Sequence, residues 1–278
     1  MRSIIEKSIK NRLTSDMVGC FLFLSCFILP FLPRNTLTVS AQTEKDLLLS
    51  SFTTNYDGTN VARSHNIALA CKYLNGCKIE GESSFSFNER VGARSKERGF
   101  SEAAVILDGK FVQGVGGGVC QVSTTLYNAA LSAGMQITEV HAHSLRVSYV
   151  APSLDAMVSS NSDLKFFNGA KTPVLLRARA KNGSVTVEIY GRNDGLSYRT
   201  KSVVLEVKEP PEAEVVYGDV EKVIKTGKKG IKSEAYLFVY RREKLLSAKR
   251  IRRDYYSSVR GVIQKVKEET ETPTEEKR

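Results

Sequence analysis

The sequence lacks several patterns by which cofactor and metal sites are recognised. It has 278 residues, with only three histidines and five cysteines, and no two cysteines form a Cys-x-x-Cys pair. The missing pair argues against a cysteine-rich zinc site. The glycine run GVGGGVC (114–120) is not followed by the Lys-Ser/Thr of a P-loop, and it lacks the final glycine of a dinucleotide fingerprint. A phosphate-binding loop is therefore excluded here, and we expect no cofactor and no metal.

The first 41 residues have the composition of a secretory signal. Four basic residues occur before position 13, and an uncharged apolar run follows at 18–33. The next polar stretch has Val39 and Ala41 at the small-residue positions of a cleavage site. The apolar run is slightly short for a membrane-spanning helix. The sequence predicts cleavage after Ala41, with an uncleaved membrane anchor as the alternative. A secreted or cell-envelope protein on the extracytoplasmic face is expected.

Acidic residues are too few to balance the basic ones, and the formal net charge is +11. The densest basic run, RREKLLSAKRIRRDYYSSVR (241–260), has eight basic and two acidic residues. In an exported chain nucleic acid is not an expected partner. Anionic wall polymers or membrane headgroups suit the charge better. A solvated strand face is the alternative interpretation of this run.

Without the signal the chain keeps an odd number of cysteines: Cys71, Cys77 and Cys120. Exported proteins meet oxidising conditions, in which disulfides form. Cys71 and Cys77 are close enough in sequence to pair, which would leave Cys120 as a free thiol. Alternatively, all three are small buried hydrophobic side chains.

Two helices and two hairpins are predicted between residues 45 and 195. Hydrophobic spacing favours helices over 63–76 and 120–133, the second ended by Gly134. Asp108-Gly109 and Asn182-Gly183 are typical of two-residue hairpin turns. Such a mixture of helices and antiparallel strands predicts an α+β domain.

Alternation of side chains predicts further strands. From Ile137 to Tyr149 apolar residues and histidines share one parity, as on one face of a strand or strand pair. The stretch KEPPEAE (208–214) is typical of a linker. A small all-β module is expected to occupy 196–267, and the polar end 268–278 is expected to be disordered.

Cys120 directly follows three glycines and stands at the start of a predicted helix. A cysteine is a nucleophile only as a thiolate, and the positive end of a helix with its free N–H groups lowers the thiol pKa. The glycines let the backbone turn sharply and let a substrate approach. The N–H groups of 118–120 could form an oxyanion hole. The predicted substrate-binding residues are Gly116, Gly117, Gly118, Gln121 and Ser123.

A catalytic cysteine also needs a base and a group that orients this base. His143 and Asp155 follow Cys120 in the chain order of papain-like and transglutaminase-like acyl-transfer sites. His143 would act as general base and then acid, Asp155 would orient it, and His141 is the reserve candidate. The alternatives are a hydrogen-bonded core histidine with a capping aspartate, or a metal site of Cys120, His141, His143 and Asp155.

Five segments resemble, in order, the VanW family of exported bacterial proteins, named from a vancomycin-resistance gene cluster. They are FSFNERVG (85–92), GGGVCQVSTTLYNAAL (116–131), HSLRVSYV (143–150), DAMV (155–158) and DLKFFN (163–168). The resemblance covers about 51 to 191. The chain departs from the family pattern at Glu80, Val140, Ser153 and Met157, none of which belongs to the candidate site.

The resemblance implies a location and a context but no reaction, because the family's activity is not established. Together with the residues around Cys120, it leads us to expect a cell-envelope protein that acts on or binds peptidoglycan. The sharper form of this hypothesis is cysteine-dependent acyl transfer, as in an amidase or transpeptidase. The alternative is a non-catalytic wall-binding or scaffold protein.

Overall fold

The structure is a computed structural model that describes residues 46–107 and 109–267. The expected signal at 1–41 and the expected disordered tail at 268–278 lie outside these residues. All described residues belong to the same compact unit of the chain. Within the described ranges, no helix is long and apolar enough to cross a membrane.

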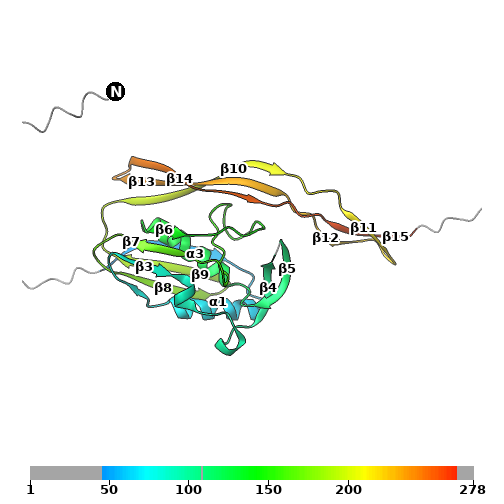
Figure 1. The fold of residues 1–278 in the computed structure, drawn as a ribbon, viewed down its shortest axis with the longest axis horizontal. Coiled ribbons are helices and arrows are strands. Elements are labelled where there is room, and N and C mark those ends of the chain that lie inside the picture. The colour runs from blue at the N-terminus through cyan, green and yellow to red at the C-terminus, as the bar shows by residue number, and fades with distance from the viewer. Residues whose placement is uncertain (1–45, 108, 268–278) are drawn as a thin grey trace, which may run out of the picture. The chain divides into compact units, whose positions relative to one another are not determined.

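A four-stranded antiparallel sheet supports the two long helices. Its strand order is β1 (Leu47–Asn55), β9 (Ser184–Gly191), β8 (Val174–Lys181) and β2 (Lys78–Ile79). Helices α1 (Val61–Leu74) and α3 (Val119–Ser132) pack against it, as Figure 1 shows. Burial alternates along β9, where Val185, Val187 and Ile189 are fully buried. Because one face of the sheet is covered by helices, these residues form the centre of the core.

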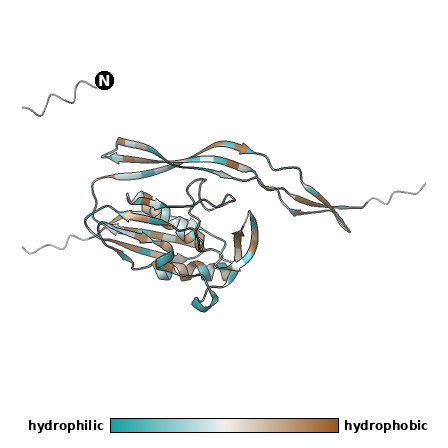
Figure 2. Cartoon of the chain, in the orientation of Figure 1, coloured by the Kyte–Doolittle hydropathy of each residue, from teal (hydrophilic) through white to brown (hydrophobic). Residues whose placement is uncertain are grey.

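A smaller sheet and a hairpin complete this part of the fold. The sheet has the order β3 (Ser83–Ser86), β7 (Lys165–Asn168) and β6 (Gln136–Glu139). The short helix α2 (Phe87–Val91) and the 3₁₀ helix η1 (Lys96–Arg98) follow β3. The hairpin of β4 (Glu102–Leu107) and β5 (Lys110–Val115) precedes α3. Figure 2 shows hydrophobic residues on this hairpin, and Phe111 on it is exposed.

Between residues 197 and 267 the regular structure consists of strands. One sheet has the order β10 (Ser197–Lys208), β13 (Gly230–Arg241) and β14 (Lys244–Tyr256). The other has the order β11 (Glu214–Gly218), β15 (Val262–Val266) and β12 (Lys222–Lys225). The stretch predicted as a linker, 208–214, runs from the last residue of β10 to the first of β11, so it joins the two C-terminal sheets.

The predicted helices and hairpins are present. The two helices start within two residues of the expected positions, and Leu107 pairs with Lys110 as Lys181 pairs with Ser184. Residue Asp108 itself lies outside the described residues. The combination of helices with antiparallel sheets agrees with the predicted α+β class.

The strand predicted over 137–149 is wrong for most of its length. Strand β6 ends at Glu139, His141 forms one isolated bridge with Met157, and 142–149 has no strand. The backbone amide of His143 donates to the Asp155 carboxylate at 2.8 Å instead of to a neighbouring strand. Burial nevertheless alternates in this irregular segment, with His143, Leu145 and Val147 buried. The alternation therefore shows that one side of the segment is buried, although the segment is not paired with a strand.

Candidate active site

Cys120 is the second residue of α3, and the glycine loop fixes where this helix begins. Gly118 is the N-cap with a φ of 107°, a left-handed conformation that L side chains rarely adopt. A Cβ on Gly118 would lie 2.9 Å from Ile67, and one on Gly117 would lie 2.7 Å from the Ala104 carbonyl oxygen. The loop thus passes tightly between α1 and β4. Glycine is required here so that the thiol is held at the start of the helix.

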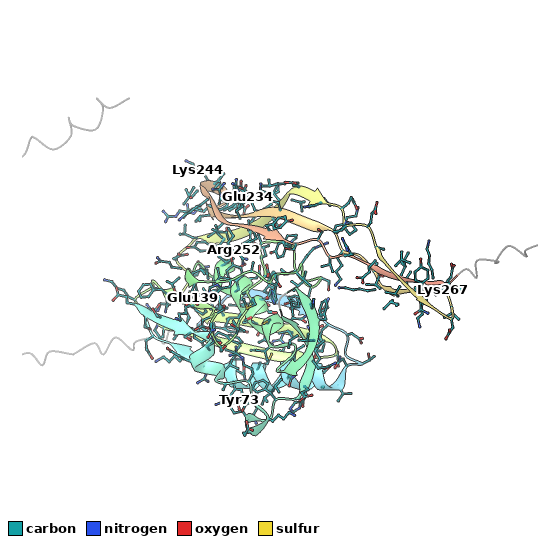
Figure 3. The ribbon with its side chains drawn as sticks, turned by 45° about the vertical axis from the view of Figure 1, so that its right-hand side comes forward. Tyr73, Glu139, Glu234, Lys244, Arg252 and Lys267 are labelled. Atoms are coloured by element: carbon teal, nitrogen blue, oxygen red, sulfur yellow. The ribbon has the colours of Figure 1, made fainter. Side chains whose placement is uncertain are left out.

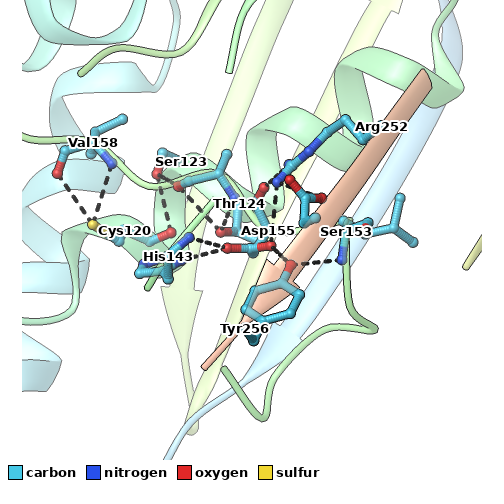
Figure 4. Close-up of polar contacts among 12 residues, drawn as sticks. Cys120, Ser123, Thr124, His143, Ser153, Asp155, Val158, Arg252 and Tyr256 are labelled. Carbon is cyan, nitrogen blue, oxygen red and sulfur yellow. Dashed lines mark hydrogen bonds and ion pairs between the residues drawn. The ribbon is translucent and has the colours of Figure 1, made fainter. Parts of the chain in front are cut away.

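His143 and Asp155 form a hydrogen-bonded pair next to Cys120. The Asp155 Oδ2 accepts from the His143 ring nitrogen Nδ1 at 2.7 Å and from the His143 amide at 2.8 Å. Both side chains are buried. Because a carboxylate accepts from Nδ1–H, the other ring nitrogen, Nε2, is left for the thiol. Figure 4 shows His143 between Cys120 and Asp155 in this view. The structure therefore brings the three predicted residues together in the order of a cysteine triad.

Two residues of β14 hold the other side of the Asp155 carboxylate. Tyr256 donates its hydroxyl to Oδ1 at 2.5 Å, and the Arg252 guanidinium lies 3.7 Å from the same oxygen (Figure 4). Arg252 also donates to the Asp155 carbonyl and pairs with Asp254 at 3.1 Å. The Tyr256 hydroxyl accepts from the Ser153 amide at 2.7 Å. The carboxylate is thus held on both oxygens. Burial raises the pKa of Asp155, but the hydrogen bond and charge of His143, with smaller contributions from Arg252 and Tyr256, outweigh burial and lower this pKa.

The charges around the thiol favour a thiolate–imidazolium pair. Burial alone raises the pKa of Cys120, but the hydrogen bond and charge of His143 outweigh it and lower this pKa, with help from the Val158 amide and Arg94. Burial alone lowers the pKa of His143, but its contacts with Asp155 and Cys120 raise it to about 9. The Cys120 Sγ lies 3.5 Å from the Val158 amide nitrogen, which donates to it, and 3.3 Å from the Val158 carbonyl oxygen. The carbonyl would accept from a neutral thiol, so the two contacts oppose each other.

The half-buried Cys120 opens into a cavity of about 960 Å³ that His143 also lines. This volume fits a ligand of several amino acids. Residues of α1, the β4–β5 hairpin, the 143–149 segment and the 157–160 loop contribute to its walls. A substrate can therefore reach the sulfur. A thiol sealed in the core would be inaccessible to a substrate.

The remaining predicted binding residues have different positions. Gly116, Gly118 and Gln121 line the cavity, whereas Gly117 and Ser123 do not. Gln121 is buried and holds neighbouring groups: it accepts from Arg63 at 2.8 Å and donates to Asn55 at 2.9 Å. Ser123 donates to the Ala156 carbonyl at 2.6 Å, and so ties α3 to the segment that carries Asp155. Contact with substrate stays a prediction for these residues.

The reserve candidate His141 lies outside the cavity lining. Its Nε2 is 3.0 Å from Glu139, which also pairs with Lys165 at 3.0 Å (Glu139 is labelled in Figure 3). In the part of the chain that the structure describes, no group of three or more His, Cys, Asp or Glu side chains is arranged to hold a metal ion. Of the four residues in the alternative metal hypothesis, Cys120, His143 and Asp155 lie together. The fourth, His141, contacts Glu139 instead.

The other two described cysteines are free thiols with ordinary structural surroundings. Cys71 is buried in the core, and burial raises its pKa to about 12. Cys77 is half-buried, and burial raises its pKa although Arg90 opposes this effect. The disulfide left open by the sequence is absent between these two residues. They provide internal references for the behaviour of Cys120.

The sequence did not predict the two residues of β14 that contact the Asp155 carboxylate. Arg252 and Tyr256 belong to the basic run 241–260, which we interpreted as a surface for anionic polymer or a solvated face. Arg252 is instead buried, and Arg250 and Arg253 both pair with the buried Glu234 on β13 (Figure 3 labels Arg252 and Glu234). No pattern in the sequence links these residues to a partner about a hundred positions earlier.

The reaction of Cys120 with iodoacetamide should reveal its lowered pKa. As the thiolate is the reacting form, the rate should rise at a pH below the ordinary thiol value of about 8.5. A second change is expected near pH 9, where His143 loses its proton. Peptide mapping by mass spectrometry measures each cysteine separately. Cys77 should react only at higher pH, and a Cys120 that titrates together with Cys77 would contradict the prediction.

Comparison with known proteins agrees with the resemblance seen in the sequence. Residues 62–190 match the family model described as VanW like protein. The chain is 38% identical over 156 residues to the uncharacterized protein YoaR of Bacillus subtilis (strain 168), which covers 56% of this chain and 51% of that protein. It is 32% identical over 78 residues to the vancomycin B-type resistance protein VanW of Enterococcus faecalis (strain ATCC 700802 / V583), 28% of each chain.

The matches cover only part of these relatives. The chain spans about half the length of the first and about a quarter of the second. Among solved structures, the crystal structure of HP0197-G5 matches 25% of this chain and 96% of its own at 17% identity. Its TM-score of 0.16 is too low to support an argument about the fold.

Proposed function

The chain belongs to the VanW family through residues 62–190, and from this premise we propose that it is a cysteine-dependent acyl-transfer enzyme of the cell envelope. The observation that carries the proposal is the arrangement of Cys120, His143 and Asp155 at an open cavity. Nucleophile, base and orienting carboxylate are the parts that such chemistry needs. The proposed substrate is a peptide stem of peptidoglycan, and the proposed reaction is hydrolysis or transpeptidation of an amide bond.

The first half-reaction would form a thioester. The Cys120 thiolate attacks the amide carbonyl, and the C–N bond breaks while the His143 imidazolium gives its proton to the leaving amine. In the second half-reaction neutral His143 takes a proton from water or from an acceptor amine, which attacks the thioester and releases the thiol group. Water gives a carboxylic acid, and an amine gives a new amide. The proton taken up in the second half-reaction restores the imidazolium, which Asp155 stabilises before the first proton transfer and after the second.

The start of α3 can stabilise the oxyanion that forms during attack. The amide of Val119 donates to Gly116 at 3.1 Å and that of Gln121 donates to Gly118 at 2.9 Å. The Cys120 amide donates to no group among the residues that the structure describes. It lies beside the sulfur and at the positive end of the helix, where a free N–H is best placed for an oxyanion.

The cell wall is proposed as the site of action from two independent considerations. One relative is named a vancomycin B-type resistance protein, and that antibiotic acts on the wall. The sequence of residues 1–41 predicts export to the compartment in which the wall lies. The proposed location is therefore extracytoplasmic.

One contact favours a non-catalytic function. The Val158 carbonyl oxygen is 3.3 Å from the Cys120 sulfur, where it would accept from a neutral thiol and hold it inert. In that case the cavity would bind a wall peptide without reacting. Such a protein would show an ordinary or raised thiol pKa in the iodoacetamide titration described above.

Incubation of the purified full chain with defined wall peptides tests the proposal. Intact-mass spectrometry should show an acyl group on the protein, mapped to Cys120, and peptide products with a new carboxyl or a new amide bond. Neutral hydroxylamine should remove the acyl group, because it cleaves thioesters. Peptides that remain unchanged, with no adduct on a thiol that alkylates readily, would contradict acyl transfer on this substrate.

A further inference from the structure

The cavity at Cys120 has an excess of positive charge. Arg63, Arg94, Arg146 and Lys228 line it against a single carboxylate, Asp57, which is already hydrogen-bonded to Thr59 at 2.9 Å. We propose that these cations bind a free carboxylate of the substrate, so that the acyl donor is an anionic peptide with its carboxylate close to the attacked bond. This inference rests on the proposed function and specifies its substrate class.

Two of the cations are held at the cavity by hydrogen bonds to uncharged groups, and Arg94 also interacts electrostatically with Asp163. The Arg63 guanidinium donates to Gln121 at 2.8 Å, and the Arg94 guanidinium donates to Asn88 at 2.7 Å. Both acceptors are uncharged amides, and neither arginine forms a salt bridge with a described residue. Both side chains are half-buried, where a charge acts over a longer distance than in water. Arg94 is near enough to lower the pKa of Cys120.

The other two cations are exposed at the cavity and form no ion pair with the described residues. Arg146 makes no hydrogen bond or ion pair with the described residues. Lys228 lies 4.5 Å from the centre of the Phe111 ring, which holds the ammonium without neutralising it. Unpaired arginine and lysine side chains around one cavity concentrate anions there.

The uncharged part of the lining favours a peptide over a simple anion. Val105, Ile106, Phe111 and Met157 lie in the same cavity as the cations. A peptide presents apolar side chains to such residues, while its carboxylate matches the planar fork of an arginine. A phosphate-containing wall polymer would use the cations but not the apolar residues, and it is a separate outcome of the test below.

Two alkylating reagents that differ in charge can test the cations directly. In both reactions the thiolate displaces iodide and a sulfur–carbon bond forms, but iodoacetate is anionic and iodoacetamide is neutral. We expect the iodoacetate/iodoacetamide rate ratio at Cys120 to exceed the ratio at Cys77 by about tenfold at pH 7 and low salt. The excess should shrink in 0.5 M salt, because salt screens exposed charges.

The His143 imidazolium also attracts an anion. Variants that remove charge from the cavity cations distinguish their effect on the rate ratio from the effect of His143. The double variant Arg146→Gln/Lys228→Gln keeps His143 and should reduce the ratio at least threefold. Lys229→Gln is the matched control, since Lys229 adjoins Lys228 but pairs with Glu209 at 2.6 Å and does not line the cavity. All three side chains are exposed, so thermal unfolding should be unchanged. An unchanged ratio in the double variant would overturn the inference.

Protection of Cys120 from iodoacetamide distinguishes the ligand class. Acetyl-Ala-Ala with a free carboxylate should protect at concentrations at least tenfold lower than its carboxamide. Equal protection by the two peptides, or better protection by glycerol phosphate than by the carboxylate peptide, would overturn the inference. If Cys120 reacts with neither reagent, the proposed function fails. Calorimetric titration with the same two peptides then decides the inference alone: a tenfold preference for the carboxylate supports it, and equal binding overturns it.

Discussion

Replacing Cys120 with alanine is expected to abolish acyl transfer completely while the protein stays folded. The substitution removes the only described thiol at the cavity and with it the atom that would form the thioester. His143→Ala should reduce the rate by about two to four orders of magnitude, because the general base and acid is lost. Release of products from wall peptides, followed by mass spectrometry, measures both effects.

The controls distinguish catalysis from packing. Cys77→Ala removes a half-buried thiol outside the cavity and should leave the rate unchanged. The double variant Cys120→Ala/His143→Ala should be no slower than Cys120→Ala, because residues that act as a unit have non-additive effects. Thermal unfolding should show a folded protein for every variant. Residual turnover by Cys120→Ala above the background rate would exclude the thiol as nucleophile.

The part of the site that is local in sequence could be predicted. A glycine run before Cys120 and an apolar stripe after it fix a loop-to-helix turn, and the helix indeed begins one residue before Cys120. The Asp108-Gly109 and Asn182-Gly183 pairs predict two-residue turns, and the strands that flank each pair are indeed paired with each other. These features depend on contacts between near neighbours, which a sequence records directly.

The segment that carries His143 shows where such reasoning stops. Alternation from Ile137 to Tyr149 predicted a strand, yet the backbone amide of His143 is satisfied by a side chain, Asp155. A pattern of buried and exposed residues reports which side of a segment faces the core. It does not report what accepts the backbone hydrogen bonds, and here that acceptor is twelve residues away.

The partners of Asp155 on β14 lie still further from it in the chain. Tyr256 and Arg252 reach the carboxylate across about a hundred residues, and they stand outside the residues that match the family model. In the sequence both residues belong to a basic run, and nothing in this run distinguishes the buried Arg252 from the exposed arginines beside it. Only the fold identifies the C-terminal sheet as the support of the triad carboxylate.

Replacing Arg252 with methionine is therefore expected to destabilise the whole protein by about 1–3 kcal/mol, because Asp155 loses one of its two cations and keeps the hydrogen bond and charge of His143. Asp155 and Arg252 are both buried, at 1% and 8% side-chain exposure, so water cannot replace the lost partner. Tyr256→Phe removes one hydrogen bond to Asp155 and the acceptor of the Ser153 amide, and should cost about 1–3 kcal/mol. Urea unfolding at pH 7 measures both values.

The neighbouring arginine Arg253 provides the matched control for this prediction. It lies on the same strand, but it is half-exposed and shares Glu234 with Arg250, so Arg253→Met should cost no more than about 1 kcal/mol. The penalty of Arg252→Met should also depend on pH. Because the pKa of Asp155 is lowered in the intact site, the ionised carboxylate stabilises the fold above the ordinary carboxyl pKa. This stabilisation is lost as the pH falls through the lowered pKa.

The pH dependence identifies the carboxylate as the cause. In Arg252→Met the pKa of Asp155 should rise, so the stability difference from the unaltered protein should be largest near pH 7 and should shrink in acid, where a neutral carboxyl no longer needs a cation. Adding Asp155→Asn to Arg252→Met should cost less than Asp155→Asn alone, because the two side chains stabilise each other. A penalty that is constant with pH, or costs that simply add, would mean that Arg252 acts through packing and not through the charge of Asp155.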